Sequence, residues 1–317
     1  MEKRIYYKFS DYLVKKYGEK VYKLPLNVKT TCPNRDGSKS NQGCIFCGEE
    51  GAGFEALSSE LSIEEQIMEN SGYIGSQYSA KKFIAYFQNY TNTYLPLSEF
   101  ECLIKKACMS NICAIYISTR PDCVTEEIAE LLQEISKENK IDIVLEIGLQ
   151  TINYKTLEIL NRQHGLAEFI DSVLISHKFG LGVCAHYISD LPWDSIEDTA
   201  EGARVLSALK VEQVKLHSLY VLENTRLGEM YKRGDFSPIS KEEFIERTIC
   251  FLENLSPNIV VQRLLGRAPA DRTLFCSWNT SWRKICDEIE EKMEIEGSYQ
   301  GKLFNYLNGS GLNEKKK

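Results

Sequence analysis

The sequence predicts an α/β fold, a partial TIM-like (β/α)6 barrel of parallel strands with helices packed outside it. Short apolar runs rich in β-branched residues alternate with longer amphipathic stretches. The runs that start at residues 112, 142, 181 and 213 are separated by 30, 39 and 32 residues, about the length of a βαβ unit. Several runs are almost continuously apolar, as expected for strands that helices cover.

The expected strands and helices alternate along the chain. The predicted strands are 21–30, 82–88, 112–119, 142–150, 181–188 and 213–221. The predicted helices are 62–78, 97–110, 125–138, 153–161, 166–179 and 195–209. Strands that alternate with helices in this way predict a parallel sheet, so residues 21–240 are expected to form the barrel.

The segments that flank the barrel are expected to differ from it. Residues 1–20 are interpreted as a basic N-terminal segment. Residues 241–306 are expected to be an extension with extra helices packed on the barrel: a helix at 241–254, an apolar run at 258–265, a loop and a helix near 280–293. The polar tail at 307–317 is expected to be disordered.

Composition indicates a globular protein without a membrane span. The chain has 317 residues, of which 43% are hydrophobic and 26% charged, and it has no apolar run of about 18 residues. The N-terminus lacks the apolar core of a secretory signal, so a cytoplasmic location is expected. The net charge of −7 disfavours a surface covered with phosphate-binding lysines, although residues 1–30 carry eight Lys or Arg against three acidic residues.

Three of the eleven cysteines fall close together after the first predicted strand. Cys32, Cys44 and Cys47 have the spacing Cys-x11-Cys-x2-Cys in a loop rich in Gly, Asn and Ser. Thiolates suit iron–sulfur clusters or zinc, and three ligands leave one iron of a cluster open to a chelating molecule. A zinc-stabilised loop with a distant fourth ligand is the alternative. The other eight cysteines show no close clustering and are expected to be buried apolar residues.

This cysteine triplet, with Phe46 just before its last member, resembles the radical S-adenosylmethionine (SAM) superfamily. The segments FQNYTNTYL (87–95), ISTRPD (117–122) and LEIGLQTINYKTLEILNRQH (145–164) follow at the matching strands. The long first spacing and the TRPD segment resemble the catalytic subunit of Elongator. The chain looks closest to a short bacterial group typified by YhcC and YtqA, which is related to the radical SAM half of that subunit. The resemblance implies a [4Fe–4S] cluster on Cys32, Cys44 and Cys47, with SAM bound at its open iron.

The resemblance also implies residues that hold SAM. Asn89, Tyr90 and Thr91 occupy the turn that holds the SAM amino group in relatives, which have glycines there. Gln150 and Arg162 match a Gln and an Arg, twelve residues apart, that bind SAM in the coproporphyrinogen dehydrogenase branch. His186 matches a position that contacts SAM. The alternatives are a helix-end ion pair for Arg162 and a satisfied core histidine for His186.

Alternation along the strands suggests further neighbours of this site. Glu146, Gly148 and Gln150 are expected to share the inner face of their strand, with Arg120 as a candidate partner for a buried Glu146. Lys215 and His217 share a face of the last barrel strand and are candidates for the substrate side. The other two histidines, His164 and His177, receive no predicted role.

The sequence constrains the identity of the substrate less than it constrains the type of reaction. The likeness to Elongator's subunit implies modification of the C5 side chain of a tRNA wobble uridine, although the chain is expected to be too short for the acetyltransferase domain of that subunit. The basic residues and tyrosines of segment 1–30 would contact phosphates and stack on bases, and core packing is the alternative for the tyrosines. A small-molecule or peptide substrate and a non-catalytic iron–sulfur protein are the other hypotheses. An electron donor such as flavodoxin or ferredoxin is expected, and no membrane partner.

Overall fold

The computed structural model describes residues 5–48, 56–269 and 272–312. The chain divides into two compact units. The first, called here the cysteine unit, consists of residues 10–149 and 157–185. The second, called the C-terminal unit, consists of residues 1–9, 150–156 and 186–317. The domain boundaries expected from the sequence remain a prediction.

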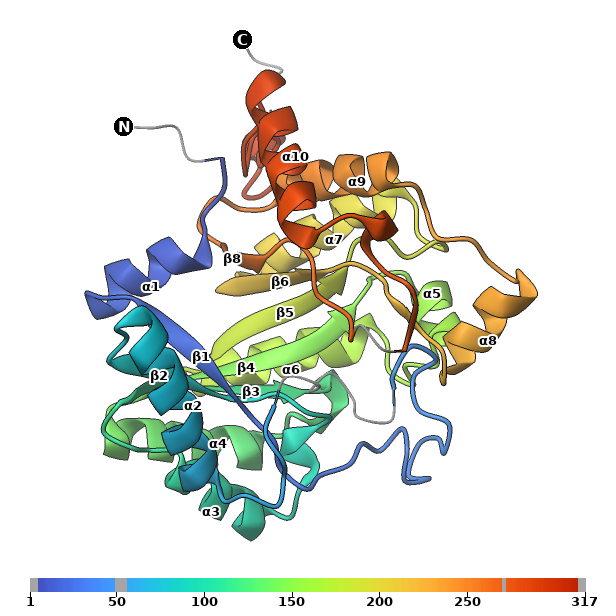
Figure 1. Ribbon diagram of the computed structural model, residues 1–317. Helices are drawn as coiled ribbons and strands as arrows, with labels where there is room; N and C mark the ends of the chain where they lie inside the picture. Colours follow the sequence, from blue (N-terminus) through green and yellow to red (C-terminus); the bar gives the residue numbers. More distant parts are fainter. Residues whose placement is uncertain (1–4, 49–55, 270–271, 313–317) are drawn as a thin grey trace. The chain divides into compact units, whose positions relative to one another are not determined.

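Seven strands form one sheet in the order β1-β2-β3-β4-β5-β6-β8 (Figure 1). Among the described residues, β7 and β9 form a separate pair. The strands are β1 Val21–Leu26, β2 Lys82–Phe87, β3 Ile112–Thr119, β4 Asp142–Gln150, β5 Gly182–Ile188, β6 Gln213–His217, β7 Val221–Leu222, β8 Val260–Arg263 and β9 Thr273–Phe275. The pairs β1·β2, β2·β3, β3·β4 and β6·β8 are parallel. The predicted α/β partial barrel is therefore confirmed.

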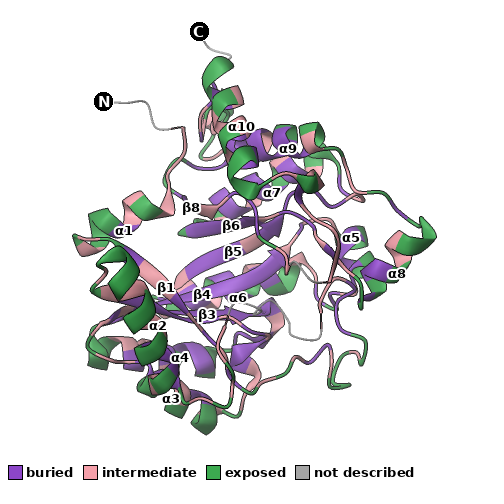
Figure 2. Ribbon diagram, viewed as in Figure 1, coloured by how far each residue is buried: buried purple, intermediate pink, exposed green. Residues whose placement is uncertain are grey.

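Helices follow the strands of the cysteine unit as the sequence predicts. They are α1 Phe9–Tyr17, α2 Ile63–Tyr78, α3 Leu97–Lys106, α4 Glu126–Asn139, α5 Tyr154–Ile159 and α6 Leu166–Lys178, where the ends of α1 and α5 fall in the other unit. Ser62 and Thr125 start α2 and α4 by accepting hydrogen bonds from the free N–H groups of the first turn. The strands β2, β3 and β4 are buried along most of their length, whereas α2, α3 and α4 expose one face (Figure 2).

Four helices belong to the C-terminal unit: α7 Ile196–Leu209, α8 Arg226–Arg233, α9 Lys241–Asn254 and α10 Trp282–Ile295. The ring of Tyr187, on β5, packs against Phe251, on α9, with 5.0 Å between ring centroids. A Cβ atom on Gly202, within α7, would lie 2.6 Å from the hydroxyl of Tyr187, so α7 packs directly on this ring. The two helices thus cover the face of β5 that carries Tyr187.

The interpretation of run 258–265 as an element outside the barrel is wrong, because β8 lies within it and pairs with β6 in the main sheet. The sequence does not predict α1 or α8, both of which are short. Within the described residues, the predicted tail 307–317 is seen as far as residue 312, with a 3₁₀ turn at Ser310–Leu312. The other residues of that tail lie outside the described part. No helix among the described residues has the length and apolar composition to cross a membrane.

Candidate functional site

The cysteine loop, defined here as residues 27–48, leaves β1 and carries all three clustered cysteines. Its own backbone folds it: the N–H of Arg35 donates to the Cys32 carbonyl at 2.8 Å, and that of Cys47 donates to the Cys44 carbonyl at 3.1 Å. Gly43 has a φ of 68°, in the left-handed region that glycine adopts without strain. The N–H of Gly43 donates to the Asn34 carbonyl at 2.7 Å and closes the longer turn.

The loop is also fixed to the segment that follows α5. Ile45 N–H donates to the Leu160 carbonyl at 3.1 Å. The side-chain amide of Asn34 donates to the Asn161 carbonyl at 2.6 Å, and the amide of Asn161 donates back to the Gly43 carbonyl at 2.7 Å. Hydrogen bonds in both directions thus join the cysteine loop to the segment that follows α5.

All three cysteines of this loop are free thiols. Cys44 is buried, and Cys32 and Cys47 are half-buried. Burial, followed by the nearby charges of Cys44 and Cys32, raises the pKa of the Cys47 thiol to about 11. The cations of Arg35 and Arg162 oppose this rise. The three thiols are close enough for Cys44 and Cys32 to affect the pKa of Cys47, and two arginines lie nearby. Thiol ligands beside cations suit a soft, negatively charged metal centre.

Two hydrogen-bond donors reach the sulfur of Cys44. Arg162 Nη1 lies 3.1 Å from Cys44 Sγ, and Asn34 Nδ2 lies 3.5 Å from it. Hydrogen bonds to ligating sulfurs are one of the means by which proteins tune iron–sulfur centres. These residues therefore fit a [4Fe–4S] cluster in their chemistry, because they offer thiol ligands with cationic and amide N–H donors around them.

Three hydrogen bonds hold the guanidinium of Arg162. Besides the contact with Cys44, its Nη2 donates to the Gly148 carbonyl at 2.7 Å and its Nε donates to His164 Nε2 at 3.1 Å. Three of the five N–H groups are used in this way, and each Nη nitrogen keeps one more. Arg162 is only 6% exposed, so the alternative of a surface ion pair is excluded.

His164, which the sequence analysis left without a role, orients Arg162. Burial first, and then the charges of Arg162 and Arg120, lower its pKa to about 3, so its ring is neutral. Nε2 accepts from Arg162, which assigns the ring proton to Nδ1, 3.3 Å from the Gly165 carbonyl. The sequence could have suggested this role for His164, because it lies only two residues from Arg162.

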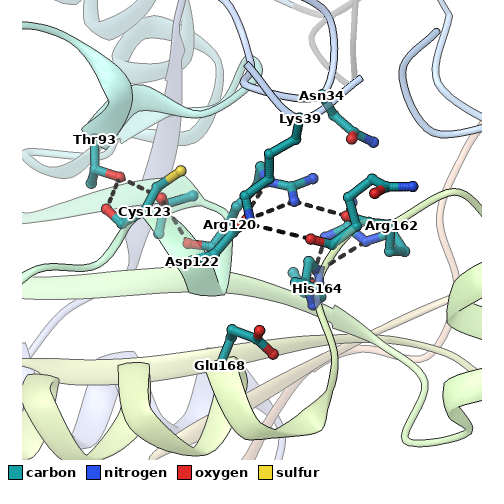
Figure 3. A network of polar contacts seen from close by, with 12 residues as sticks. Asn34, Lys39, Thr93, Arg120, Asp122, Cys123, Arg162, His164 and Glu168 are labelled. Carbon is teal, nitrogen blue, oxygen red and sulfur yellow. Dashed lines mark hydrogen bonds and ion pairs between the residues drawn. The ribbon is translucent and has the colours of Figure 1, made fainter. Parts of the chain in front are cut away.

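Arg120 and Asp122 connect Arg162 to the cysteine loop (Figure 3). Arg120 holds Asp122 through two N–H···O bonds of 2.9 Å and donates to the Arg162 carbonyl at 2.7 Å. Asp122 forms an ion pair with Lys39 of the cysteine loop, with 2.7 Å between Lys39 Nζ and Asp122 Oδ2. Burial raises the pKa of Asp122, but the hydrogen bonds and charge of Arg120 outweigh it and lower the value to about 2, so this carboxylate is ionised.

The expected pairing of Glu146 with Arg120 is wrong. Glu146 is buried as expected but forms its ion pair with Lys23, on β1. The Lys23 ammonium lies 4.4 Å from the ring centroids of both Tyr86 and Tyr116, which stand on the strands between β1 and β4. The lysine side chain thus crosses two strands over the faces of two aromatic rings. Cation–π attraction there offsets part of the free-energy cost of removing its charge from water.

The predicted SAM-binding turn, Asn89–Thr91, follows β2 beside the cysteine loop. Tyr90 has a φ of 51°, in the left-handed region that glycine adopts without strain. The N–H of Thr91 donates to the Thr31 carbonyl at 3.4 Å, and the Arg35 guanidinium lies 5.3 Å from the Tyr90 ring centroid. The turn and the cysteines are therefore brought together, as are the cysteines and Arg162.

The remaining two predicted SAM contacts belong to the C-terminal unit. Gln150 ends β4 with a φ of 74°, a strained conformation for a residue with a Cβ atom. His186, on β5, lies against His217, on β6, with 5.0 Å between ring centroids. Their part in binding SAM remains a prediction.

Comparison with known proteins gives a consistent result over the whole chain. The model of the Radical SAM superfamily matches residues 36–204, and that of the Radical SAM C-terminal domain matches residues 211–295. The uncharacterized protein MJ0486 of Methanocaldococcus jannaschii is 34% identical over 307 residues, 95% of this chain and 92% of the relative. YtqA of Bacillus subtilis is 30% identical over 310 residues (96% and 94%), and YhcC of Escherichia coli K12 is 29% identical over 298 residues (93% and 95%).

Two more distant matches are a relative named for an activity on tRNA and a solved structure. The tRNA uridine(34) acetyltransferase of Methanocaldococcus infernus is 30% identical over 151 residues, 46% of this chain and 27% of the relative. The structure of Elp3 from the same archaeon has a TM-score of 0.69 at 18% identity and covers 88% of this chain. This chain spans 64% of that structure, less than two thirds, and the likeness shows the fold alone.

Proposed function

Because the chain belongs to the radical SAM superfamily, whose enzymes use a [4Fe–4S] cluster and SAM, we propose that Cys32, Cys44 and Cys47 are the cluster ligands of this radical SAM enzyme. The observation that carries the assignment is the cysteine loop, in which three free thiols lie beside Arg35 and Arg162. When bound and reduced, the cluster supplies the electron that cleaves SAM and yields the radical that abstracts a hydrogen atom from the substrate.

The residues around the cysteines suit the methionyl end of SAM. Arg162 retains one N–H on each Nη nitrogen, enough to fork onto the two oxygens of a carboxylate. The turn Asn89–Thr91, whose Thr91 N–H donates to the Thr31 carbonyl of the cysteine loop, is proposed to hold the SAM amino group. Gln150 and His186 complete the proposed SAM contacts. His164 and Arg120 act by orienting Arg162.

For the substrate, we propose a tRNA wobble uridine that is modified on its C5 side chain. The support is the 30% identity to a tRNA uridine(34) acetyltransferase over 151 residues, 46% of this chain. A wobble uridine lies in a single-stranded anticodon loop, where a base can leave its stack and enter an active site. Such chemistry on tRNA would take place in the cytoplasm, with a flavodoxin or a ferredoxin as electron donor.

The deciding experiment compares modified nucleosides in tRNA from wild-type cells and from cells that lack this chain. We expect one wobble-uridine derivative to disappear and its precursor to accumulate. With purified protein, dithionite, SAM and the precursor tRNA, 5′-deoxyadenosine should form in proportion to the lost precursor. An unchanged nucleoside profile, together with SAM cleavage stimulated by a peptide or a metabolite, would favour the small-molecule or peptide hypothesis.

A further inference from the structure

The loop that joins β5 to α7, residues 189–195, is held in place by buried polar contacts within the C-terminal unit. Arg247, on α9, donates to the carbonyls of Leu191 and Asp194 at 3.0 and 2.8 Å. The Asp194 carboxylate accepts a hydrogen bond from the Thr156 hydroxyl, on α5, at 2.5 Å. Arg247 and Asp194 are 4% and 6% exposed, so water competes little for these contacts. Helices α5 and α9 thus fix the backbone on either side of residue 193.

This loop carries Trp193, whose ring is supported by other aromatic rings. Its indole packs against the ring of Phe236, with 5.2 Å between centroids and 48° between the ring planes. Phe236 is buried and packs in turn on Tyr231 of α8, with 6.0 Å between centroids. Trp193 itself is half-buried, so part of its indole is accessible to a solute. The unit therefore supports this ring and leaves part of it uncovered.

The other two of the chain's three tryptophans interact with polar protein groups. The indole N–H of Trp278 donates to the Ile239 carbonyl at 2.7 Å. The guanidinium of Arg283 lies 5.3 Å from the ring centroid of Trp282. Among the described residues, by contrast, no group accepts a hydrogen bond from the indole N–H of Trp193. This ring therefore has both a fixed position and a donor that a ligand can use.

We propose that Trp193 is a stacking platform for an unpaired base of the RNA substrate. Its loop leaves the carboxyl end of β5, the end of a strand at which α/β enzymes bind their ligands. An aromatic side chain stacks on any base, and a ring that is already fixed loses little conformational entropy on binding. An anticodon loop offers unpaired bases, the wobble uridine among them. The platform deepens the proposed function, on which it rests, by naming a residue that contacts the tRNA.

The first test measures the dissociation constant of an anticodon stem-loop, with uridine at the wobble position, from the cluster-loaded protein. Trp193→Leu should raise this constant roughly tenfold or more, because the stacking contribution is lost. Trp193→Phe should raise it less, since a phenyl ring still stacks on a base. Trp282→Leu, which removes an exposed tryptophan of the same unit, is the matched control and should leave the constant unchanged. Equal dissociation constants for wild type and Trp193→Leu would overturn the proposal.

The second test observes the contact through the fluorescence of the tryptophan itself. A base stacked on an indole quenches its fluorescence, so the stem-loop should quench wild-type protein and Trp282→Leu. Trp193→Phe, at an RNA concentration that saturates it, should show little quenching, although the other two tryptophans remain. Circular dichroism and iron content show whether each variant is folded. Undiminished quenching in Trp193→Phe would mean that the base stacks elsewhere, and the proposal would be wrong.

A third measurement separates a base of the RNA from the adenine of SAM, which is also a planar ring. The affinity for SAM should be the same in wild type and Trp193→Leu. A loss of SAM affinity with RNA binding unaltered would mean that Trp193 stacks on SAM, which contradicts the proposal. If wild type does not bind the stem-loop, the tRNA hypothesis fails and the platform with it. If wild type and Trp193→Leu bind it equally well, the platform is refuted while the tRNA hypothesis stands.

Discussion

Cys32, Cys44 and Cys47 differ in burial but are proposed to act as one set of ligands. Replacing any one by Ala leaves two thiols, too few for a stable cluster with an open iron, so we expect loss of the brown colour and of most bound iron. Iron and sulfide analysis of anaerobically purified protein measures this, with about four of each expected per wild-type chain. Cys102→Ala, at an exposed position outside the loop, is the control. Zinc in place of iron after anaerobic reconstitution would contradict the assignment.

Arg162 touches a proposed ligand sulfur and retains donors for a carboxylate, so its replacement should have two effects. Arg162→Ala should weaken SAM binding by roughly 1.5–3 kcal/mol, the range for a hydrogen bond to a charged group. The loss of an N–H···S contact and of a buried positive charge should also make the reduction potential of the cluster more negative.

Equilibrium binding of SAM and a redox titration followed by electron paramagnetic resonance measure the two effects separately. Arg35→Gln, which removes a cation that lies near Cys47 and bonds to its carbonyl at 3.0 Å, is a useful comparison. It should shift the potential in the same direction with a smaller effect on SAM affinity. Unchanged SAM affinity in Arg162→Ala would show that the proposed carboxylate contact is wrong.

At the scale of the element, two glycines within helices have opposite environments. Gly202 in α7 faces the buried Tyr187 ring, and an added Cβ atom would lie 2.6 Å from its hydroxyl. Gly72 in α2 is exposed, with nothing within 4 Å of an added Cβ atom. Alanine favours a helix by up to about 1 kcal/mol relative to glycine.

Gly202→Ala should lower the free energy of unfolding by about 1–3 kcal/mol, because overpacking outweighs the gain in helix propensity. Gly72→Ala should raise it by about 0.5–1 kcal/mol. Chemical denaturation of both variants beside wild type measures the changes. Equal effects of the same sign would mean that the packing of α7 on β5 does not control stability.

The sequence predictions were accurate where a feature depends on residues near one another in the chain, and failed where it depends on how distant segments pair. Strand β3 and helix α9 were predicted with their exact ends. The apolar periodicity and the capping residues that define such ends lie close together in the sequence. Helix α1 was missed because nine residues carry little periodicity, although Gly18 with a φ of 79° marks its end. The partner of Glu146 was missed for a different reason, because it depends on the sheet order that brings Lys23 across two strands.

At the scale of the whole molecule, the basic character of segment 1–30 is reduced by its surroundings. Among its described lysines, Lys8, Lys16, Lys23 and Lys29 form ion pairs with carboxylates. Lys23 is largely buried, so it is unsuited to hold a phosphate. The hypothesis that this segment binds tRNA therefore depends most on Lys15 and Lys20, which are exposed and take no part in these four ion pairs.

Replacing Lys15 and Lys20 together by Gln should weaken tRNA binding and flatten its salt dependence by about 0.7 in the log–log slope for each lost phosphate contact. The control replaces Lys137 and Lys140, two exposed lysines at the end of α4, and should leave the slope unchanged. Titrations of tRNA at several salt concentrations give the slopes. Identical slopes in wild type and both double variants would remove segment 1–30 from the tRNA interface.

The hydrogen bonds that shape the cysteine loop have a consequence for the maturation of the enzyme. In zinc-finger peptides the metal must drive folding, so the free energy of metal binding is consumed in ordering the chain. Here Asn34, Asn161 and the Ile45–Leu160 contact join the loop to the segment after α5 through groups that are not among the proposed ligands. The newly made apoprotein should thus present its three thiols ready for transfer from a cluster carrier, and Asn161→Ala should slow that transfer without changing the iron content finally reached.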